Sequence, residues 1–294
     1  DLHYPLRRQR QMCIRDSYYP ITYGRNVQYN GLTLDPFQED ACNYVVEGHS
    51  VVVSAATGTG KTLVAEFSIT HYTFRGMRSV YTSPIKALSN QKYRDFCRQY
   101  GADKVGILTG DVSINPTAQI LVMTTEVYRN MALSDPTSIM DVGLLILDEV
   151  HFMNDEERGT VWEESIIFSP NSVRFLALSA TIPNAPEFAQ CIASVHNHEV
   201  KVVEHMQRAV PLEHSFFMGK GKLQSYRDIL NFQQVSGRLR RGAARSKKRP
   251  RSRPPPDFND LLDIIKYEEL TPCIFFSFSR KDCEEKAITT AQSK

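Results

Sequence analysis

The chain has 294 residues, of which 41% are hydrophobic and 23% charged, and its formal net charge is +2. This composition is typical of a soluble globular protein, and no apolar run reaches the ~18 residues that a membrane-spanning helix needs. Six scattered cysteines without a C-x-x-C pair exclude a disulfide or zinc framework and indicate free thiols in a reducing, intracellular compartment. The sequence does not distinguish between the cytoplasm, the nucleus and an organelle as this compartment.

Residues 1–17 show neither a strand period nor a helix period, and we expect them to be a non-native leader. Beyond them, short continuous apolar runs alternate with longer amphipathic stretches. Such runs are typical of strands buried on both faces, so the pattern predicts a mostly parallel α/β sheet. The expected strands are Val51–Ser54, Val80–Thr82, Val105–Thr109, Ile120–Thr124, Leu144–Asp148 and Phe175–Ser179, with short ones near Glu199–Glu204 and Leu212–Phe217.

A helix start precedes the first of these strands. Asp35 suits the N-cap, Pro36 the first helical position, and Gln38 stands three residues after the cap. These residues predict a capping box, which by itself needs no ligand.

A glycine-rich loop follows the first buried strand and leads into a helix expected over Leu63–Thr73. Glycines let the backbone curl so that successive N–H groups point inward, and the helix adds the positive end of its dipole. In such a loop, Lys61 reaches the β- and γ-phosphates of a nucleotide, and Thr62 binds Mg²⁺. The loop residues are Ala55, Ala56, Thr57, Gly58, Thr59 and Gly60; Ala55 replaces the glycine that opens the usual pattern.

An acidic box ends the strand at Leu144–Leu147 and reads Asp148-Glu149-Val150-His151. Ligands collect at the carboxyl ends of parallel strands, so this box and the glycine-rich loop are expected to meet at one nucleotide. Asp148 suits the Mg²⁺ ligand, and Glu149 suits the base that orients and deprotonates water. Ser179-Ala180-Thr181 ends a further strand.

In this order, the three motifs resemble those of superfamily 2 helicases, in which alanine is common at the position of Ala55. Four longer strings are similar to the superkiller-type, exosome-assisting DExH RNA helicases: Tyr81–Arg94, Leu108–Asp111, Val122–Glu126 and Arg158–Glu164. The resemblance implies a RecA-like P-loop lobe and an ATP- and Mg²⁺-dependent enzyme that translocates on single-stranded RNA, with an RNA-decay complex as a partner. It also implies that Gln38 contacts adenine, and that His151, Ser179 and Thr181 couple the nucleotide state to movement.

Further candidates suit contacts to a bound strand. Ser83 and Pro84 are expected to begin a helix with Ser83 as N-cap, and the free N–H groups and Lys86 would meet a phosphate. Such contacts carry no sequence information. The other strand-end candidates are Thr109, Gly110, Thr124, Thr125 and Glu126.

The rest of the chain divides by composition. Residues 18–198 are expected to form the first lobe and residues 199–235 a connection. Residues 236–256 carry nine Lys or Arg and no acid, which predicts a disordered linker or a nucleic-acid-binding arm. Residues 257–294 are expected to begin a second RecA-like lobe that is cut short, with a helix near 257–269, a strand at Cys273–Ser277 and a helix from Arg280; the fragment alone would then be poorly active.

The sequence therefore favours an ATP-dependent RNA helicase. Two alternatives stay open: a DNA helicase of the same superfamily, since phosphate and sugar contacts separate RNA from DNA only through the 2′-hydroxyl, and a nucleotide-dependent RNA clamp without turnover.

Overall fold

The computed structural model describes residues 27–154, 159–182, 184–208, 210–217, 223–231 and 258–292. The predicted leader and the basic segment at 236–256 lie outside these ranges. The chain divides into two compact units, Asp1–Val210 and Pro211–Lys294. None of the described helices is long and apolar enough to span a membrane.

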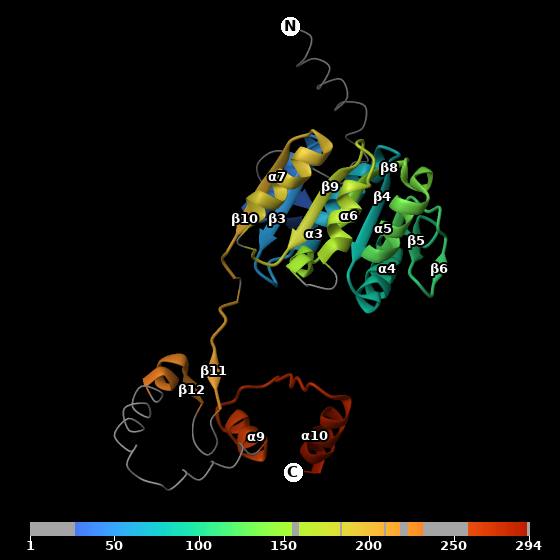
Figure 1. Cartoon of the computed structure of the whole chain (residues 1–294). Coiled ribbons are helices and arrows are strands. Elements are labelled where there is room, and N and C mark those ends of the chain that lie inside the picture. Colours follow the sequence, from blue (N-terminus) through green and yellow to red (C-terminus); the bar gives the residue numbers. More distant parts are fainter. Residues whose placement is uncertain are drawn as a thin grey trace, which may run out of the picture. The chain divides into compact units, whose positions relative to one another are not determined.

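The first unit is built on an eight-stranded sheet, as Figure 1 shows. Its spatial order is β10-β3-β9-β8-β4-β7-β5-β6, and every neighbouring pair is parallel except β5 with β6. The predicted mostly parallel α/β sheet is therefore confirmed. The strands are β3 (Ser50–Ala55), β4 (Arg78–Ser83), β5 (Val105–Leu108), β6 (Ser113–Ile114), β7 (Ile120–Thr124), β8 (Val142–Leu147), β9 (Arg174–Ser179) and β10 (Val200–His205).

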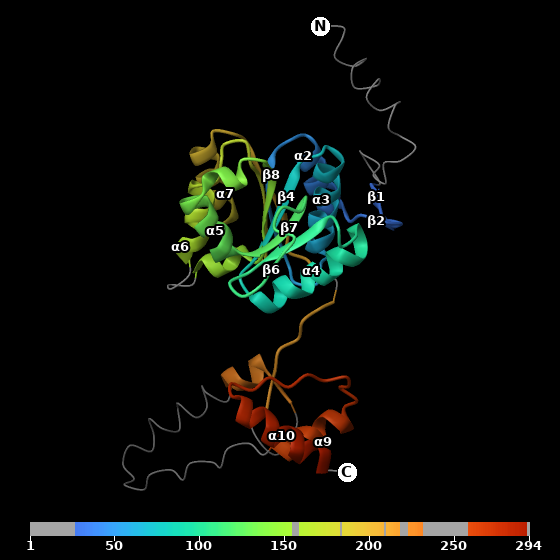
Figure 2. The ribbon, with the colours of Figure 1, turned by 90° about the vertical axis from the view of Figure 1, so that its right-hand side faces the viewer.

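Helices cover both faces of this sheet (Figure 2). On one face lie α2 (Pro36–Val46), α3 (Lys61–Phe74) and α4 (Lys86–Tyr100), and on the other α5 (Thr125–Ser134), α6 (Gly159–Ile167) and α7 (Ala185–His196). Each layer packs on its own apolar cluster. This two-sided burial explains the continuous apolar runs, since every residue of β3 and β7 is buried.

Short elements complete the unit. The hairpin of β1 (Gln28–Tyr29) and β2 (Leu32–Thr33) is antiparallel, and two 3-10 helices are η1 (Pro136–Ile139) and η2 (Val150–Asn154). These elements and β6 are too short to produce a periodic sequence signal, so the sequence did not predict them.

The first unit extends beyond the boundary expected at residue 198. Strand β10 pairs with β3 along six residues, from Val200 opposite Ser50 to His205 opposite Ala55. Residues expected to begin a connection thus belong to the main sheet, and the compact unit ends at Val210.

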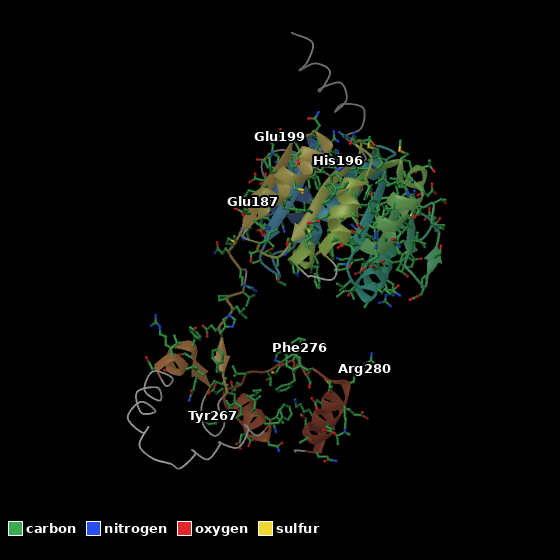
Figure 3. All side chains as sticks on the ribbon, in the orientation of Figure 1. Glu187, His196, Glu199, Tyr267, Phe276 and Arg280 are labelled. Carbon is green, nitrogen blue, oxygen red and sulfur yellow. The ribbon has the colours of Figure 1, made fainter. Side chains whose placement is uncertain are left out.

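The second unit contains a two-residue ladder, β11 (Ser215–Phe216) with β12 (Gln224–Ser225), and the helices α9 (Phe258–Tyr267) and α10 (Arg280–Gln292). The prediction of a strand at Cys273–Ser277 is wrong, because this segment is irregular. Ile274 and Phe276 are 79% and 92% exposed, and Phe276 is labelled in Figure 3. A strand is stabilised by backbone hydrogen bonds to a neighbour, and among the described residues this segment pairs with none.

Two histidines of the first unit give its stability a pH dependence. Burial lowers the pKa of His71 on α3 to about 4, with a smaller effect of Arg75 in the same direction. Burial also lowers the pKa of His198 to about 4, helped by Arg174. Both rings stay neutral in the folded state at pH values where they are protonated in the unfolded chain. We therefore expect the free energy of unfolding contributed by these groups to be intact above pH 6.5 and to fall as the pH drops from 6.5 to 4.

Denaturant unfolding at pH values between 4 and 7.5 measures this effect. His71→Gln should flatten the dependence of the unfolding free energy on pH in this window. His214→Gln, which alters an exposed histidine of the second unit, should leave the slope unchanged. Equal slopes in wild type and His71→Gln would contradict the assignment to His71.

Candidate functional site

The predicted site residues gather at one edge of the main sheet, because they follow the carboxyl ends of its parallel strands. The strand order divides them into two neighbouring groups. The loop after β3, the acidic box after β8 and the motif ending β9 lie on the half formed by β3, β9 and β8. The candidates for strand contact follow β4, β7 and β5 on the other half. The seam between the two groups is the pairing of β8 with β4.

The glycine-rich loop connects β3 to α3 as predicted. Gly58 and Gly60 have φ angles of 86° and 81°, a left-handed conformation that glycine adopts without steric cost. The hydroxyl of the buried Thr59 donates to the carbonyl of Ala56 at 2.7 Å. A Cβ atom on Gly60 would lie 2.7 Å from Nε2 of Gln38, so a side chain there would displace the Gln38 amide and would also be strained by the left-handed backbone. The loop is therefore a tight backbone cradle of the kind that holds phosphate.

Lys61 begins α3 and folds back over the loop. Its Nζ donates to the carbonyl oxygens of Ala55 at 2.7 Å and Ala56 at 3.1 Å. Burial lowers the pKa of the Lys61 ammonium, and the nearby Glu149 and Asp148 carboxylates oppose that shift. The positive charge of the loop and the acidic box are thus close enough to act on one ligand. The next residue, Thr62, is partly buried, and its Oγ1 accepts a hydrogen bond from Nζ of Lys92 at 3.4 Å.

Gln38 joins the start of α2 to the same loop. The predicted capping box is confirmed, with Oε1 of Gln38 accepting from the backbone N–H of Asp35 at 2.9 Å. Its Nε2 donates to the carbonyls of Thr59 and Gly60, each at 3.1 Å. The backbone N–H of Ala56 donates to the carbonyl of His205 at the end of β10. Both the amide of Gln38 and the edge strand β10 therefore fix the loop.

The acidic box leaves β8 in a constrained conformation. Glu149 has a φ angle of 54°, which is costly for a residue with a Cβ atom, and its N–H donates to Oδ1 of Asp148 at 3.0 Å. The other carboxylate oxygen of Asp148, Oδ2, accepts a hydrogen bond from the hydroxyl of Tyr81 on β4. Burial, followed by the charge of Asp148, raises the pKa of Tyr81 well above its ordinary value, so the phenol keeps its proton and donates a hydrogen bond at neutral pH.

Glu149 has the electrostatic surroundings of a proton acceptor. Burial and the neighbouring Asp148 raise the pKa of its carboxyl, while His151 and Lys61 partly offset this shift. Nδ1 of His151 lies 3.3 Å from Oε2 of Glu149. A half-buried carboxylate with a raised pKa, close to a histidine, can accept a proton from water.

Ser179 ends β9 beside Ser54 of the loop strand β3, and Thr181 follows two residues later. Ser179 is fully buried, and within the described residues its hydroxyl has no hydrogen-bond partner, whereas Thr181 is exposed. The backbone N–H of Ile182 donates to Oγ of Ser54 on β3 at 3.1 Å, which ties this motif to the glycine-rich loop.

On the other half of the edge, the helix start expected at Ser83 needs a correction. Ser83 is the last residue of β4, paired with Thr124 of β7, and the N-cap of α4 is Ile85. The ladder to β7 keeps Ser83 in the strand, and Pro84 separates it from the helix. Lys86 is exposed, and its Nζ lies 2.5 Å from Oδ2 of Asp111.

The remaining strand-contact candidates lie at the ends of β5 and β7. Thr109 is buried with its Oγ1 accepting from the N–H of Val112 at 3.2 Å, and Gly110 is exposed beside Lys86. Thr124 is the N-cap of α5, and Thr125 and Glu126 form its first turn. The hydroxyls of the buried Ser83 and Thr125 have no hydrogen-bond partner among the described residues. Each half of the edge thus contains hydroxyl groups that make no hydrogen bond within the described residues.

The donor set fits a nucleotide with Mg²⁺. A hydroxyl and a carboxylate are oxygen ligands that Mg²⁺ accepts alongside water and phosphate oxygens. No group of three or more His, Cys, Asp or Glu in the described ranges could hold a metal ion unaided. Thr62 and Asp148 therefore suit a metal that also takes ligands from phosphate.

Sequence reasoning missed two residues that contact this site, Tyr81 and Lys92. Tyr81 lies within an apolar strand, where an aromatic residue is expected in any core, and Lys92 lies on a helix of mixed polarity. Only the adjacency of β4 and β8 could have indicated them, and the strand order is not readable from the sequence.

Comparison with known proteins finds helicases, both as a matching family and as individual relatives. The model of the DEAD/DEAH box helicase family matches residues 35–188, just over half of the chain. The chain is 41% identical over 278 residues to the DExH-box ATP-dependent RNA helicase DExH9 of Arabidopsis thaliana, covering 87% of this chain and 28% of the relative. It is 38% identical over 288 residues to the human exosome RNA helicase MTR4, covering 93% and 27%. The chain thus spans little more than a quarter of the length of these relatives.

Two solved structures are similar to part of the chain at lower sequence identity. The helicase domain of Hef from Pyrococcus furiosus has a TM-score of 0.45 at 23% identity, covering 57% of this chain and 38% of that one. The DUF1998 helicase MrfA bound to DNA has a TM-score of 0.47 at 20% identity, covering 62% and 28%.

Proposed function

The chain belongs to the DEAD/DEAH box helicase family, and from that premise we propose that it is part of an ATP-dependent RNA helicase that couples ATP binding and hydrolysis to movement along single-stranded RNA. The observation that carries the proposal is the shared sheet edge, on which a phosphate cradle and an acidic box lie beside unused hydroxyls and Lys86. One rigid sheet then holds both ligands.

On the nucleotide half, each residue has one role in the proposal. The loop from Ala55 to Gly60 surrounds the phosphates with backbone N–H groups, and Lys61 binds the β- and γ-phosphates. Thr62 and Asp148 would hold Mg²⁺, which neutralises phosphate charge when bound. Glu149 accepts the proton of the attacking water.

Three further roles connect the nucleotide to its surroundings. We assign adenine contact to Gln38. Its side-chain amide donates to two carbonyls of the loop, and it would replace one of these hydrogen bonds with one to the base edge. His151 contacts Glu149, and Ser179 ends the strand next to the loop strand with Thr181 two residues later, so these three residues are suited to couple the phosphate state to movement.

On the RNA half, the candidates bind sugar and phosphate rather than bases. Lys86 offers a positive charge beside Gly110. Helix α5 begins at Thr125 after its N-cap Thr124, and the N–H groups of its first turn, which have no acceptor within the helix, lie at the same edge. Binding of this kind is independent of sequence, as a motor that moves along RNA requires. The full set is Ser83, Pro84, Lys86, Thr109, Gly110, Thr124, Thr125 and Glu126.

The proposal extends to the domain plan and the partner. Residues 18–198, with β10, form the first RecA-like lobe, and residues 257–294 belong to a second one. Because relatives include an exosome RNA helicase, we infer that the protein acts in an RNA-decay complex inside the cell.

Binding of RNA and DNA of equal length tests the RNA assignment. We expect labelled 20-nucleotide U, A and C oligomers of RNA to bind with similar affinity, more tightly than the matching DNA, and with a steep salt dependence measured by fluorescence anisotropy. Lys86→Gln should reduce the slope of log K against log salt by about 0.7, the value for one phosphate contact on a single strand.

Lys104→Gln is the matched control, because this exposed lysine precedes β5 and so lies at the opposite edge of the sheet. Its slope should equal that of the wild type. Equal affinity for DNA would favour a DNA helicase, and a base preference that survives high salt would contradict backbone recognition.

A further inference from the structure

Strand β4 lies at the seam between the two halves of the site. It pairs with β8, which carries the acidic box, and with β7, which carries strand-contact candidates. Its own last residue, Ser83, and the helix that follows carry further candidates. Contacts from β4 and α4 to the nucleotide half would therefore connect the two ligands directly.

The first such contact fixes Asp148. Tyr81 on β4 is fully buried, and its hydroxyl donates to Oδ2 of Asp148. The backbone N–H of Asp148 also donates to the carbonyl of Thr82, the next residue of β4, at 3.0 Å. With Oδ1 accepting from the N–H of Glu149, both carboxylate oxygens have a donor in the protein. The direction of this carboxylate is thus set by the Tyr81 hydroxyl of β4 at one oxygen and by the Glu149 N–H at the other.

The second contact reaches the other proposed metal ligand. Nζ of Lys92, on α4, donates to Oγ1 of Thr62 at 3.4 Å and lies 5.9 Å from the centre of the Tyr81 ring. Both proposed Mg²⁺ ligands are therefore contacted by side chains of one strand–helix unit, β4–α4.

Packing alone does not require a hydroxyl at position 81. The ring packs edge-on against Phe96, with centroids 5.4 Å apart, and a phenylalanine would make the same contact. A buried hydroxyl is costly unless it is hydrogen-bonded, and here its partner is the carboxylate.

We propose that Tyr81 is a positioning residue for Mg²⁺, and that through it the β4–α4 unit, which carries Ser83 and Lys86, sets the direction of the metal ligand Asp148. This proposal rests on the proposed function, because it takes Asp148 as a Mg²⁺ ligand. Residues that orient a metal ligand typically change metal affinity by ~10–100-fold when mutated.

Tyr81→Phe tests the proposal in the complete 294-residue chain. The readout is binding of a fluorescent N-methylanthraniloyl ATP analogue, measured while Mg²⁺ is titrated from a chelated baseline. We expect the Mg²⁺ concentration at half-maximal effect to rise about tenfold, and the affinity for the analogue in excess chelator to match the wild type.

Tyr128→Phe is the matched control, because Tyr128 is equally buried and its hydroxyl is hydrogen-bonded to Ser169, away from the site. Both variants lose one buried hydrogen bond, so both should lose thermal stability, but only Tyr81→Phe should shift the Mg²⁺ midpoint. The double variant Tyr81→Phe/Asp148→Asn should show the same midpoint as Asp148→Asn alone, since the hydroxyl acts through that carboxylate.

The outcomes distinguish a failure of the proposed role of Tyr81 from a failure of the proposed function. A Mg²⁺ titration of Tyr81→Phe that overlays the wild type, or additive effects in the double variant, would overturn the role of Tyr81. Failure of the wild-type chain to bind the analogue at any Mg²⁺ concentration would instead overturn the proposed function.

Discussion

Replacing Lys61 with alanine should abolish measurable ATP binding while leaving the fold intact. Hydrogen bonds to charged groups contribute about 1.5–3 kcal/mol each, and in the proposed function Lys61 contacts two phosphates. Loss of both contacts corresponds to a decrease in affinity of at least ~100-fold. Among the described residues, the hydrogen bonds of the lysine go to the carbonyls of Ala55 and Ala56 in the same loop, so the melting temperature should change little.

Equilibrium titration with a fluorescent ATP analogue, together with a thermal melt, measures both quantities. Lys104→Ala serves as the control for removal of a lysine from the opposite edge of the same unit. Equal ATP affinity in Lys61→Ala and the wild type would refute the assignment of residues 55–62 as a phosphate-binding loop.

Glu149→Gln should preserve nucleotide binding and lower the rate of ATP hydrolysis by ~10²–10⁴-fold, the usual contribution of a general base. Glutamine keeps the size of the side chain and cannot accept the proton. Burial and Asp148 raise the pKa of Glu149, and only the ionised form is a base. The wild-type rate should therefore fall as the pH drops through this raised pKa, and Glu149→Gln should lack that decrease.

Single-turnover hydrolysis of radiolabelled ATP resolves slow rates and measures this effect. Glu187→Gln, at an exposed position in the first turn of α7 that is labelled in Figure 3, is the control. Equal hydrolysis by Glu149→Gln and the wild type would exclude Glu149 as the base. Binding without hydrolysis in a protein that also carries the rest of the second lobe would favour the alternative of an RNA clamp without turnover.

Much of the first unit was predictable because its sequence patterns are local. Continuous apolar runs identified the strands of the main sheet except β6, and Asp35, Pro36 and Gln38 identified the start of α2. Each of these signals depends on near neighbours in the chain. The order of the strands depends on which apolar faces meet, and no local pattern encodes it.

The incorrect predictions also depend on contacts between residues that are far apart in the chain. Ser83 has the composition of an N-cap, but its pairing with Thr124 keeps it in β4. Residues 273–277 have the composition of a buried strand, but an apolar run becomes a strand only beside a partner. The contact between Tyr81 and Asp148 joins residues 67 positions apart and depends on the adjacency of β4 and β8.

The pairing of β10 with β3 has a practical consequence for recombinant expression. A product shortened to end at residue 198 would lose β10 and turn β3 into an edge strand. The six residues of β3 include Val51, Val52 and Val53 and carry no charge, so their unpaired N–H and C=O groups would form a template for intermolecular aggregation. Soluble protein should require a C-terminus beyond His205, whose carbonyl also anchors Ala56 in the glycine-rich loop.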